Sequence, residues 1–94
     1  MKYEIIPSST FKKDLKLAKK GGLNLSFLKR VIDLLAASDS PLPKEYKDHN
    51  LCGNYEGFRE CHIQPDWLLI YKKNQENLFL YLTRTGSHSD LFKK

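Results

Sequence analysis

Two apolar segments lie close together near the end of the chain, at residues 67–72 and 78–85. Between them stand the polar residues 74–77, two of which are asparagines, a residue favoured in tight turns. The pattern predicts two antiparallel strands joined by this turn. A third strand is predicted for residues 58–63, and it ends before Pro65 because proline has no backbone N–H to donate within a sheet. We expect the upstream residues to support this sheet.

The first half of the chain predicts one short strand and two amphipathic helices. Apolar and polar residues alternate over residues 3–5, and Pro7 ends this strand. Capping residues bound the two helices: Ser8, Ser9 or Thr10 and then Gly21-Gly22 for the first, and Asn24 or Ser26 and then residues 38–40 for the second. Apolar residues recur at helical spacing within them: Phe11, Leu15 and Ala18 in the first, and Leu28, Val31, Ile32 and Leu35 in the second.

These elements predict a single α+β domain spanning residues 1–94. An N-terminal strand precedes an antiparallel helical hairpin, which packs on a small, mainly antiparallel sheet in the order β-α-α-β-β-β. Pro41 and Pro43 force an extended connection after the helices, because proline fixes its own φ and disfavours helix in the residue before it. Residues 44–51 are too polar for a core element, and we expect an ordered loop that brings His49 toward the sheet.

Charge and cysteine content narrow the class of protein. Sixteen Lys and Arg against eleven Asp and Glu leave a net charge of +5, which favours a polyanion or an acidic protein as partner. No apolar run approaches the ~20 residues of a transmembrane helix, and the N-terminus lacks the apolar region of a signal peptide, so a cytoplasmic protein without a membrane partner is expected. Cys52 and Cys61 have no CxxC spacing, and both are expected to be reduced.

Groups that move protons or hold phosphate stand at the ends of the predicted strands, and they are His62, Asp66, Arg84 and His88. Histidine titrates near neutrality, so two histidines can act as general base and general acid without a metal or cofactor. Arginine can neutralise the charge that grows on a phosphate during transfer. This set of residue types suits cleavage of RNA by attack of the ribose 2′-OH on the adjacent phosphorus.

Structural roles are open for the same residues. His62 on a strand can have a purely structural role. Asp66 can cap the turn after Pro65, and Arg84 can pair with an acidic residue at the surface. Trp67 fits the core better than a base-stacking surface, because apolar residues follow it. Phe92, near the end of the chain, can become buried only by folding back on the site, where a base can stack on it. The histidines and cysteines lack the paired short spacing of zinc sites, so no metal site is expected.

The sequence also resembles a known family, the YafQ-type toxins of the RelE/ParE superfamily, which belong to bacterial type II toxin–antitoxin systems. The resemblance covers nearly the whole chain, and its specific part is carried by Tyr46-Lys47-Asp48-His49, Leu51, Gly53, Gly57, Arg59, His62, residues 65–71, Arg84-Thr85-Gly86, His88, Leu91 and Phe92. It implies a ribosome-dependent endoribonuclease that cleaves mRNA and is neutralised by a cognate antitoxin. It also implies that operator DNA is bound by the toxin–antitoxin complex.

The resemblance assigns functional residues by position. The catalytic group comprises His49, His62, Asp66, Arg84 and His88, and Phe92 is a substrate-binding residue. Lys47 and Trp67 are further candidates for substrate binding, beyond the residues that the resemblance assigns. His88 is the expected general acid, Asp66 the leading candidate for general base, and Arg84 the clamp on the transition-state phosphate. His49 and His62 are expected to assist, and Phe92 to position a nucleotide. The lysine face of the helical hairpin becomes an expected contact with ribosomal RNA.

Two other functions remain open at this point. Toxins of the same superfamily act on DNA gyrase, although a histidine-rich site argues against that because such a toxin needs no proton transfer. A non-catalytic basic binding module is the second alternative. Loss of His88 or Asp66 would leave the activity of such a module unchanged.

Overall fold

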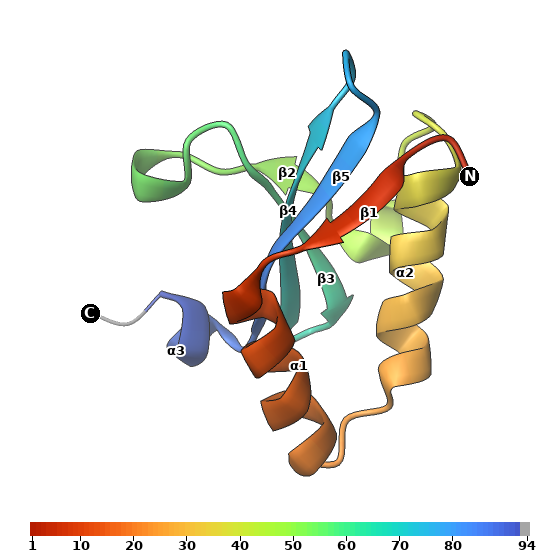
Figure 1. The fold of residues 1–94 in the computed structure, drawn as a ribbon. Coiled ribbons are helices and arrows are strands. Elements are labelled where there is room, and N and C mark those ends of the chain that lie inside the picture. The colour runs from red at the N-terminus through yellow and green to blue at the C-terminus, as the bar shows by residue number, and fades with distance from the viewer. Residues whose placement is uncertain (93–94) are drawn as a thin grey trace.

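The computed structural model describes residues 1–92 (Figure 1). Its elements, in chain order, are β1 (Glu4–Pro7), α1 (Ser9–Lys20), α2 (Leu25–Ala37), the short 3-10 helix η1 (Lys44–Tyr46), β2 (His49–Asn50), the 3-10 helix η2 (Gly53–Tyr55), β3 (Arg59–Gln64), β4 (Trp67–Asn74), β5 (Phe79–Gly86) and α3 (His88–Leu91). The predicted α+β class and the order of its main elements are confirmed. Within residues 1–92, every helix is too short or too polar to span a bilayer.

The five strands form one mixed sheet in the order β1-β5-β4-β3-β2. Only the β1–β5 pair is parallel, which agrees with the predicted mainly antiparallel sheet. Strand β4 lies between β3 and β5, so these two strands are not neighbours in the sheet. The predicted loop 44–51 instead contains the two-residue strand β2, whose His49 pairs with Glu60 and Asn50 with Arg59.

The helical hairpin begins at well-formed caps. Ser8 is the N-cap of α1 and its hydroxyl accepts a hydrogen bond from the Phe11 backbone N–H, while Asn24 caps α2 through Ser26. Both capping residues were among the predicted candidates. Figure 1 shows α1 and α2 running in opposite directions from a short connection, with α2 beside the sheet.

The sheet has a buried face and a partly open face. Side chains alternate along a strand, so Cys61 and Ile63 of β3 and Leu69 of β4 pack with the two helices in the main core. The opposite face holds a smaller cluster of Leu68, Ile70 and Leu91, and α3 supplies the last of these. This cluster covers only part of the face, which leaves room there for polar side chains.

One buried polar contact links the start of β4 to the end of β5. The Thr85 hydroxyl accepts a hydrogen bond from Trp67 Nε1 at 2.9 Å and donates one to the Leu68 carbonyl at 2.7 Å. Thr85 and Trp67 are each only 2% exposed, so water cannot replace these bonds. The contact therefore fixes the strand ends that precede the candidate site.

Replacement of Thr85 by valine tests this contact. Valine keeps the shape but leaves the indole N–H and a carbonyl unpaired, so we expect Thr85→Val to lower the free energy of unfolding by about 1–3 kcal/mol. Urea denaturation measures the change. Thr83→Val, at a partly exposed position in the same strand, is the matched control. Equal stability of the two variants would contradict a structural role for the Thr85 hydroxyl.

Candidate active site

Three histidines from different elements form a row on the open face. The ring centroids of His49 and His62 lie 6.4 Å apart, and those of His62 and His88 lie 5.8 Å apart. Phe92 extends the row, 6.3 Å from His88. The structure therefore brings together side chains that are up to 43 residues apart in the sequence (His49 to Phe92).

Strand register explains how these side chains meet. Directly opposed residues in antiparallel strands point to the same face, so His49 of β2, Glu60 of β3, Ile70 of β4 and Arg84 of β5 form one cross-strand row. His62 stands two residues after Glu60 and therefore lies on the same face.

A bulge in the pairing of β4 with β5 turns Arg84 to this face. Leu80 and Leu82 of β5 pack in the helix-side core, and strict alternation would send Arg84 there too. The register shifts between Ile70 and Tyr71, so that Thr83 is an extra residue in β5. Beyond it Thr85 becomes the buried residue, and Arg84 stands opposite Ile70.

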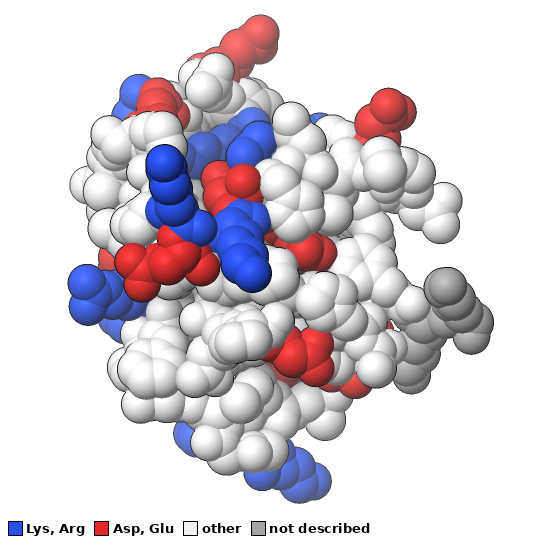
Figure 2. All heavy atoms as spheres, turned by 180° about the vertical axis from the view of Figure 1, so that it is seen from behind, with Lys and Arg blue, Asp and Glu red and all other residues white. Residues whose placement is uncertain are grey.

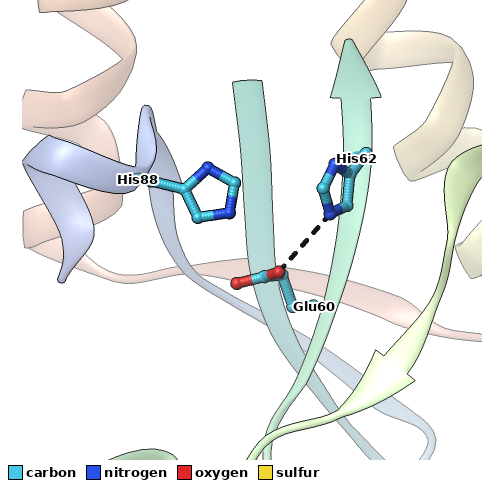
Figure 3. Close-up of side chains that lie close together, drawn as sticks. All are labelled: Glu60, His62 and His88. Atoms are coloured by element: carbon cyan, nitrogen blue, oxygen red, sulfur yellow. Dashed lines mark ion pairs between the residues drawn. The ribbon is translucent and has the colours of Figure 1, made fainter. Parts of the chain in front are cut away.

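Each of the three histidine rings has an oxygen acceptor at Nδ1. His49 Nδ1 lies 2.7 Å from the Lys47 carbonyl, His62 Nδ1 lies 3.2 Å from the Pro65 carbonyl, and His88 Nδ1 lies 2.8 Å from Asp66 Oδ1. An acceptor there requires the proton on Nδ1, which leaves Nε2 as the exchangeable atom of each neutral ring. Figure 3 shows the rings of His62 and His88 on either side of the Glu60 carboxylate.

Asp66 holds His88 in two ways. One carboxylate oxygen accepts hydrogen bonds from the His88 backbone N–H at 3.1 Å and from its ring. These bonds, the backbone one first, lower the pKa of Asp66 below its ordinary value. The short helix α3 fixes the His88 backbone as well, because Ser87 and Asp90 form a capping box at its start.

Glu60 is a site residue that the sequence reasoning missed. It is only 3% exposed, and its Oε1 lies 3.4 Å from His49 Nε2 and 3.6 Å from His62 Nε2. The signal was present in strand 59–64, where Glu60 and His62 alternate with apolar Cys61 and Ile63 and so had to share a face. The buried carboxylate is a common partner for two of the histidines.

Arg84 is paired with a second residue that sequence reasoning missed. Asp14 of α1 accepts hydrogen bonds from Arg84 Nε at 2.8 Å and from Nη2 at 3.1 Å. The bonds to Asp14 raise the pKa of Arg84, so this guanidinium stays charged. Arg84 keeps about a quarter of its side chain exposed. It lines a groove of about 860 Å³ together with Asp66 and Ser87, beside α1.

The three expected substrate-binding residues have different surroundings. Phe92 folds back as expected, with its ring 5.8 Å from that of Tyr55, and it is 37% exposed. The Lys47 side chain is exposed, while its carbonyl holds His49. Trp67 is a correction: only 2% of it is exposed and its indole N–H is bonded to Thr85, so it forms a wall and offers no free ring face to a base.

Glu60, His62 and His88 can also be considered as metal ligands. Each offers one ligand atom, and these atoms lie within 4.8 Å of one another. Imidazole nitrogens and a carboxylate form a donor set suited to transition metals. The spacing of histidines and cysteines predicted no metal site, but Glu60 adds a carboxylate to the two histidines as a third possible ligand. A metal bound here would occupy nitrogens that acid–base chemistry needs.

The geometry can support proton transfer next to an anion. Three imidazoles present Nε2 on one face, a charged guanidinium stands in the same cross-strand set, and an exposed aromatic ring closes the row. Phosphodiester transfer needs a base, an acid and a cationic clamp, and this face offers all three. The fold and site thus define a small α+β protein of the nucleic-acid-cleaving class.

Comparison with known proteins gives the family. Residues 3–93 match the family model for the YafQ bacterial toxin of type II toxin–antitoxin systems, so the chain belongs to the YafQ toxin family. It is 44% identical over 85 residues to the mRNA interferase toxin YafQ of Escherichia coli K12, covering 90% of each chain.

Solved structures agree with this membership. The E. coli DinJ–YafQ complex contains a chain 42% identical to this one, with a TM-score of 0.87 and coverage of 96% of this chain and 98% of that one. A metal-bound toxin from Helicobacter pylori is 46% identical, with a TM-score of 0.88 and coverage of 96% and 99%. The recognised resemblance and the predicted fold are both confirmed.

The pKa of Asp66 gives a test of the His88 contact. A lowered pKa in the folded state means that the contribution of this contact to stability is present above the ordinary value of 3.8 and is lost as the pH falls through the folded-state value. We expect an NMR titration of the Asp66 carboxyl to have its midpoint below 3.8. His88→Ala should move it part of the way back, because the backbone N–H remains. An Asp66 midpoint above 3.8 would contradict the contact.

Proposed function

We propose that this chain is the toxin of a type II toxin–antitoxin system and cleaves mRNA on the ribosome as an endoribonuclease. The observation that carries the proposal is the row of three histidines, each with Nδ1 held by an acceptor, so that Nε2 is the atom that exchanges protons. Nε2 of His49 and of His62 faces the Glu60 carboxylate, which stabilises a proton taken up there. The name of the E. coli relative, mRNA interferase toxin YafQ, agrees with this chemistry. A cytoplasmic location follows, because the substrate is mRNA on a translating ribosome.

The reaction needs two proton transfers and no metal. Nε2 of His49 or His62 takes the proton of a ribose 2′-OH, and the 2′-oxygen forms a bond to the adjacent phosphorus. The bond from phosphorus to the 5′-oxygen breaks, and Nε2 of His88 gives its proton to that oxygen. The products are a 2′,3′-cyclic phosphate and a free 5′-hydroxyl. Arg84 balances the negative charge that grows on the non-bridging oxygens.

Asp66 fits a positioning role better than the role of general base. Its lowered pKa makes the carboxylate a weak base at neutral pH, and one of its oxygens already accepts two hydrogen bonds from His88. The carboxylate instead fixes the tautomer and orientation of the His88 ring. We therefore assign the proton of the 2′-OH to His49 or His62.

Substrate contacts follow from exposure. Phe92 has a partly exposed ring beside His88, where a nucleotide base can stack. The exposed Lys47 side chain stands near His49 and can pair with a phosphate of the message. Trp67 supports the neighbouring Asp66 from within the core.

Partners are inferred from charge and from the relatives. The lysines of α1 are exposed, and they suit the phosphates of ribosomal RNA. Figure 2, seen from behind the view of Figure 1, shows basic and acidic side chains together, with a further basic group at the lower edge, so the charge on this face is mixed. The E. coli relative is found in a complex with DinJ, and we propose a cognate antitoxin here, with operator DNA bound only by the complex.

Loss of the acid or the clamp tests the assignment. We expect His88→Ala and Arg84→Ala each to slow mRNA cleavage in a translating extract by roughly 10²–10⁴-fold, because each removes a group used in the transition state. Ser89→Ala, at the next position of α3, is the control and should cleave normally. Full activity of either site variant would contradict its assigned role. An inactive wild type that still binds RNA would favour the basic binding module, and inhibition of gyrase would favour the other superfamily function.

Ribosome contact is tested by charge. Binding through phosphates releases counterions, so cleavage should weaken steeply as the salt concentration rises. Reversal of Lys12, Lys13 and Lys16 to glutamate should weaken cleavage further and reduce its dependence on salt. Cleavage rates at several salt concentrations measure both effects. Unchanged salt dependence in the triple variant would show that α1 does not bind the ribosome.

A further inference from the structure

Asp14 is a nearly buried acidic residue that the reaction scheme above does not use. It is 9% exposed, although it lies in the lysine-rich helix α1, whose other charged side chains face solvent. Its carboxylate accepts three hydrogen bonds, two from Arg84 and one from the Thr85 backbone N–H at 3.1 Å. A buried carboxylate is costly unless it is fully paired, so the position of Asp14 needs a reason.

The end of β5 has no strand partner on the side of α1. Strand β1 pairs with β5 only as far as Leu82, and the chain then turns through Ser8 into α1. The Ser8 side chain takes over the next contact by donating to the Thr83 carbonyl at 2.9 Å. Further along β5, the backbone N–H of Thr85 donates a hydrogen bond to Asp14. Asp14 therefore takes the place of a strand partner beside Arg84.

The two bonds to Arg84 fix the plane of its guanidinium. The carboxylate meets Nε and Nη2 along one edge, a bidentate arrangement that defines orientation as well as distance. Without such a partner an arginine side chain samples many rotamers. About a quarter of the Arg84 side chain stays exposed, which leaves part of it accessible to a phosphate.

We propose that Asp14 is a positioning residue for Arg84, which holds the guanidinium in the orientation that receives the transition-state phosphate. The inference rests on the proposed function, since it concerns the same reaction. Asp14 thereby links α1, which is proposed to contact the ribosome, to Arg84, which is proposed to bind the phosphate. Asp14 touches no reacting atom, and its effect passes through Arg84.

Asp14→Asn separates this role from simple support of the fold. The asparagine side-chain oxygen can still accept from the Thr85 N–H and from Arg84 Nε, which share one carboxylate oxygen in the wild type, whereas the NH₂ group that replaces the other oxygen cannot accept from Nη2, so the bidentate pairing is lost. We expect kcat for cleavage on saturating ribosomes to fall roughly 10- to 100-fold, as displacement of a catalytic group does, with KM for ribosomes unchanged. Asp33→Asn, the same change at an exposed position of α2, should cleave like the wild type.

A double-mutant cycle supplies the decisive readout. In an Arg84→Ala background, Asp14→Asn should cause no further loss of cleavage, because its effect acts only through the missing guanidinium. Thermal unfolding of all four proteins shows whether each is folded at the assay temperature. If Asp14→Asn is unfolded there, the same cycle is run with Asp14→Glu, which keeps the charge and displaces the carboxylate by one methylene.

The outcomes separate this inference from the proposed function. A wild type that does not cleave mRNA overturns the proposed function itself. A wild type that cleaves, with a folded Asp14 variant of equal kcat, overturns only the role of Asp14. An equal loss from the Asp14 substitution with and without Arg84 also overturns it, because the effect would then be independent of the guanidinium.

Discussion

The burial of β4 on both faces is the constraint on which the rest of the structure depends. Residues Trp67 to Tyr71 are all at most 2% exposed, so each face of this central strand needs a cover. Two helices cover one face completely. Among residues 1–92, the other face is covered by Leu91 and by the partly buried Leu51, Tyr55 and Phe58, and this incomplete cover leaves Glu60 and His62 beside an accessible surface. The site thus lies at the edge of the smaller hydrophobic cluster, where polar side chains replace apolar ones on the open face.

Most of the fold could be predicted from local patterns because its main elements satisfy local rules. Helical periodicity marked α1 and α2, and the apolar segments around residues 74–77 marked the β4–β5 pair. Strand β2 was not predicted because its two residues carry no periodic signal. It is held by distant contacts: Tyr71 and Arg59 donate hydrogen bonds to Asp48, and Arg59 also donates to Asn50. The residues on both sides of His49 are therefore fixed by tertiary structure alone.

The candidate site was predicted in part, for equally physical reasons. The histidines, Asp66 and Arg84 stood out because their side chains have chemistry to offer. The structure places the three histidines and Asp66 in one group, and Arg84 lines a groove together with Asp66. Asp14 was overlooked, although its position three residues after Phe11 and four before Ala18 places it on the apolar face of α1. The bulge at Thr83 gave no such signal, since one extra residue changes which face Arg84 occupies without changing the apolar pattern.

The reactive groups share one arrangement, in which an oxygen accepts a hydrogen bond from one nitrogen of each side chain. Carbonyls hold His49 and His62, Asp66 holds His88, and Asp14 holds Arg84, so that one nitrogen of each remains directed to the site. Pre-oriented groups need no rearrangement during reaction, which is where much of the catalytic advantage of such sites arises. Backbone carbonyls accept from His49 and His62, which lie next to turns where such carbonyls are not used in the sheet. Carboxylates serve His88 and Arg84, because the first stands on a four-residue helix and the second at an unpaired strand edge. The type of support therefore follows from the local backbone, and the carboxylates, being charged, make the stronger hydrogen bonds.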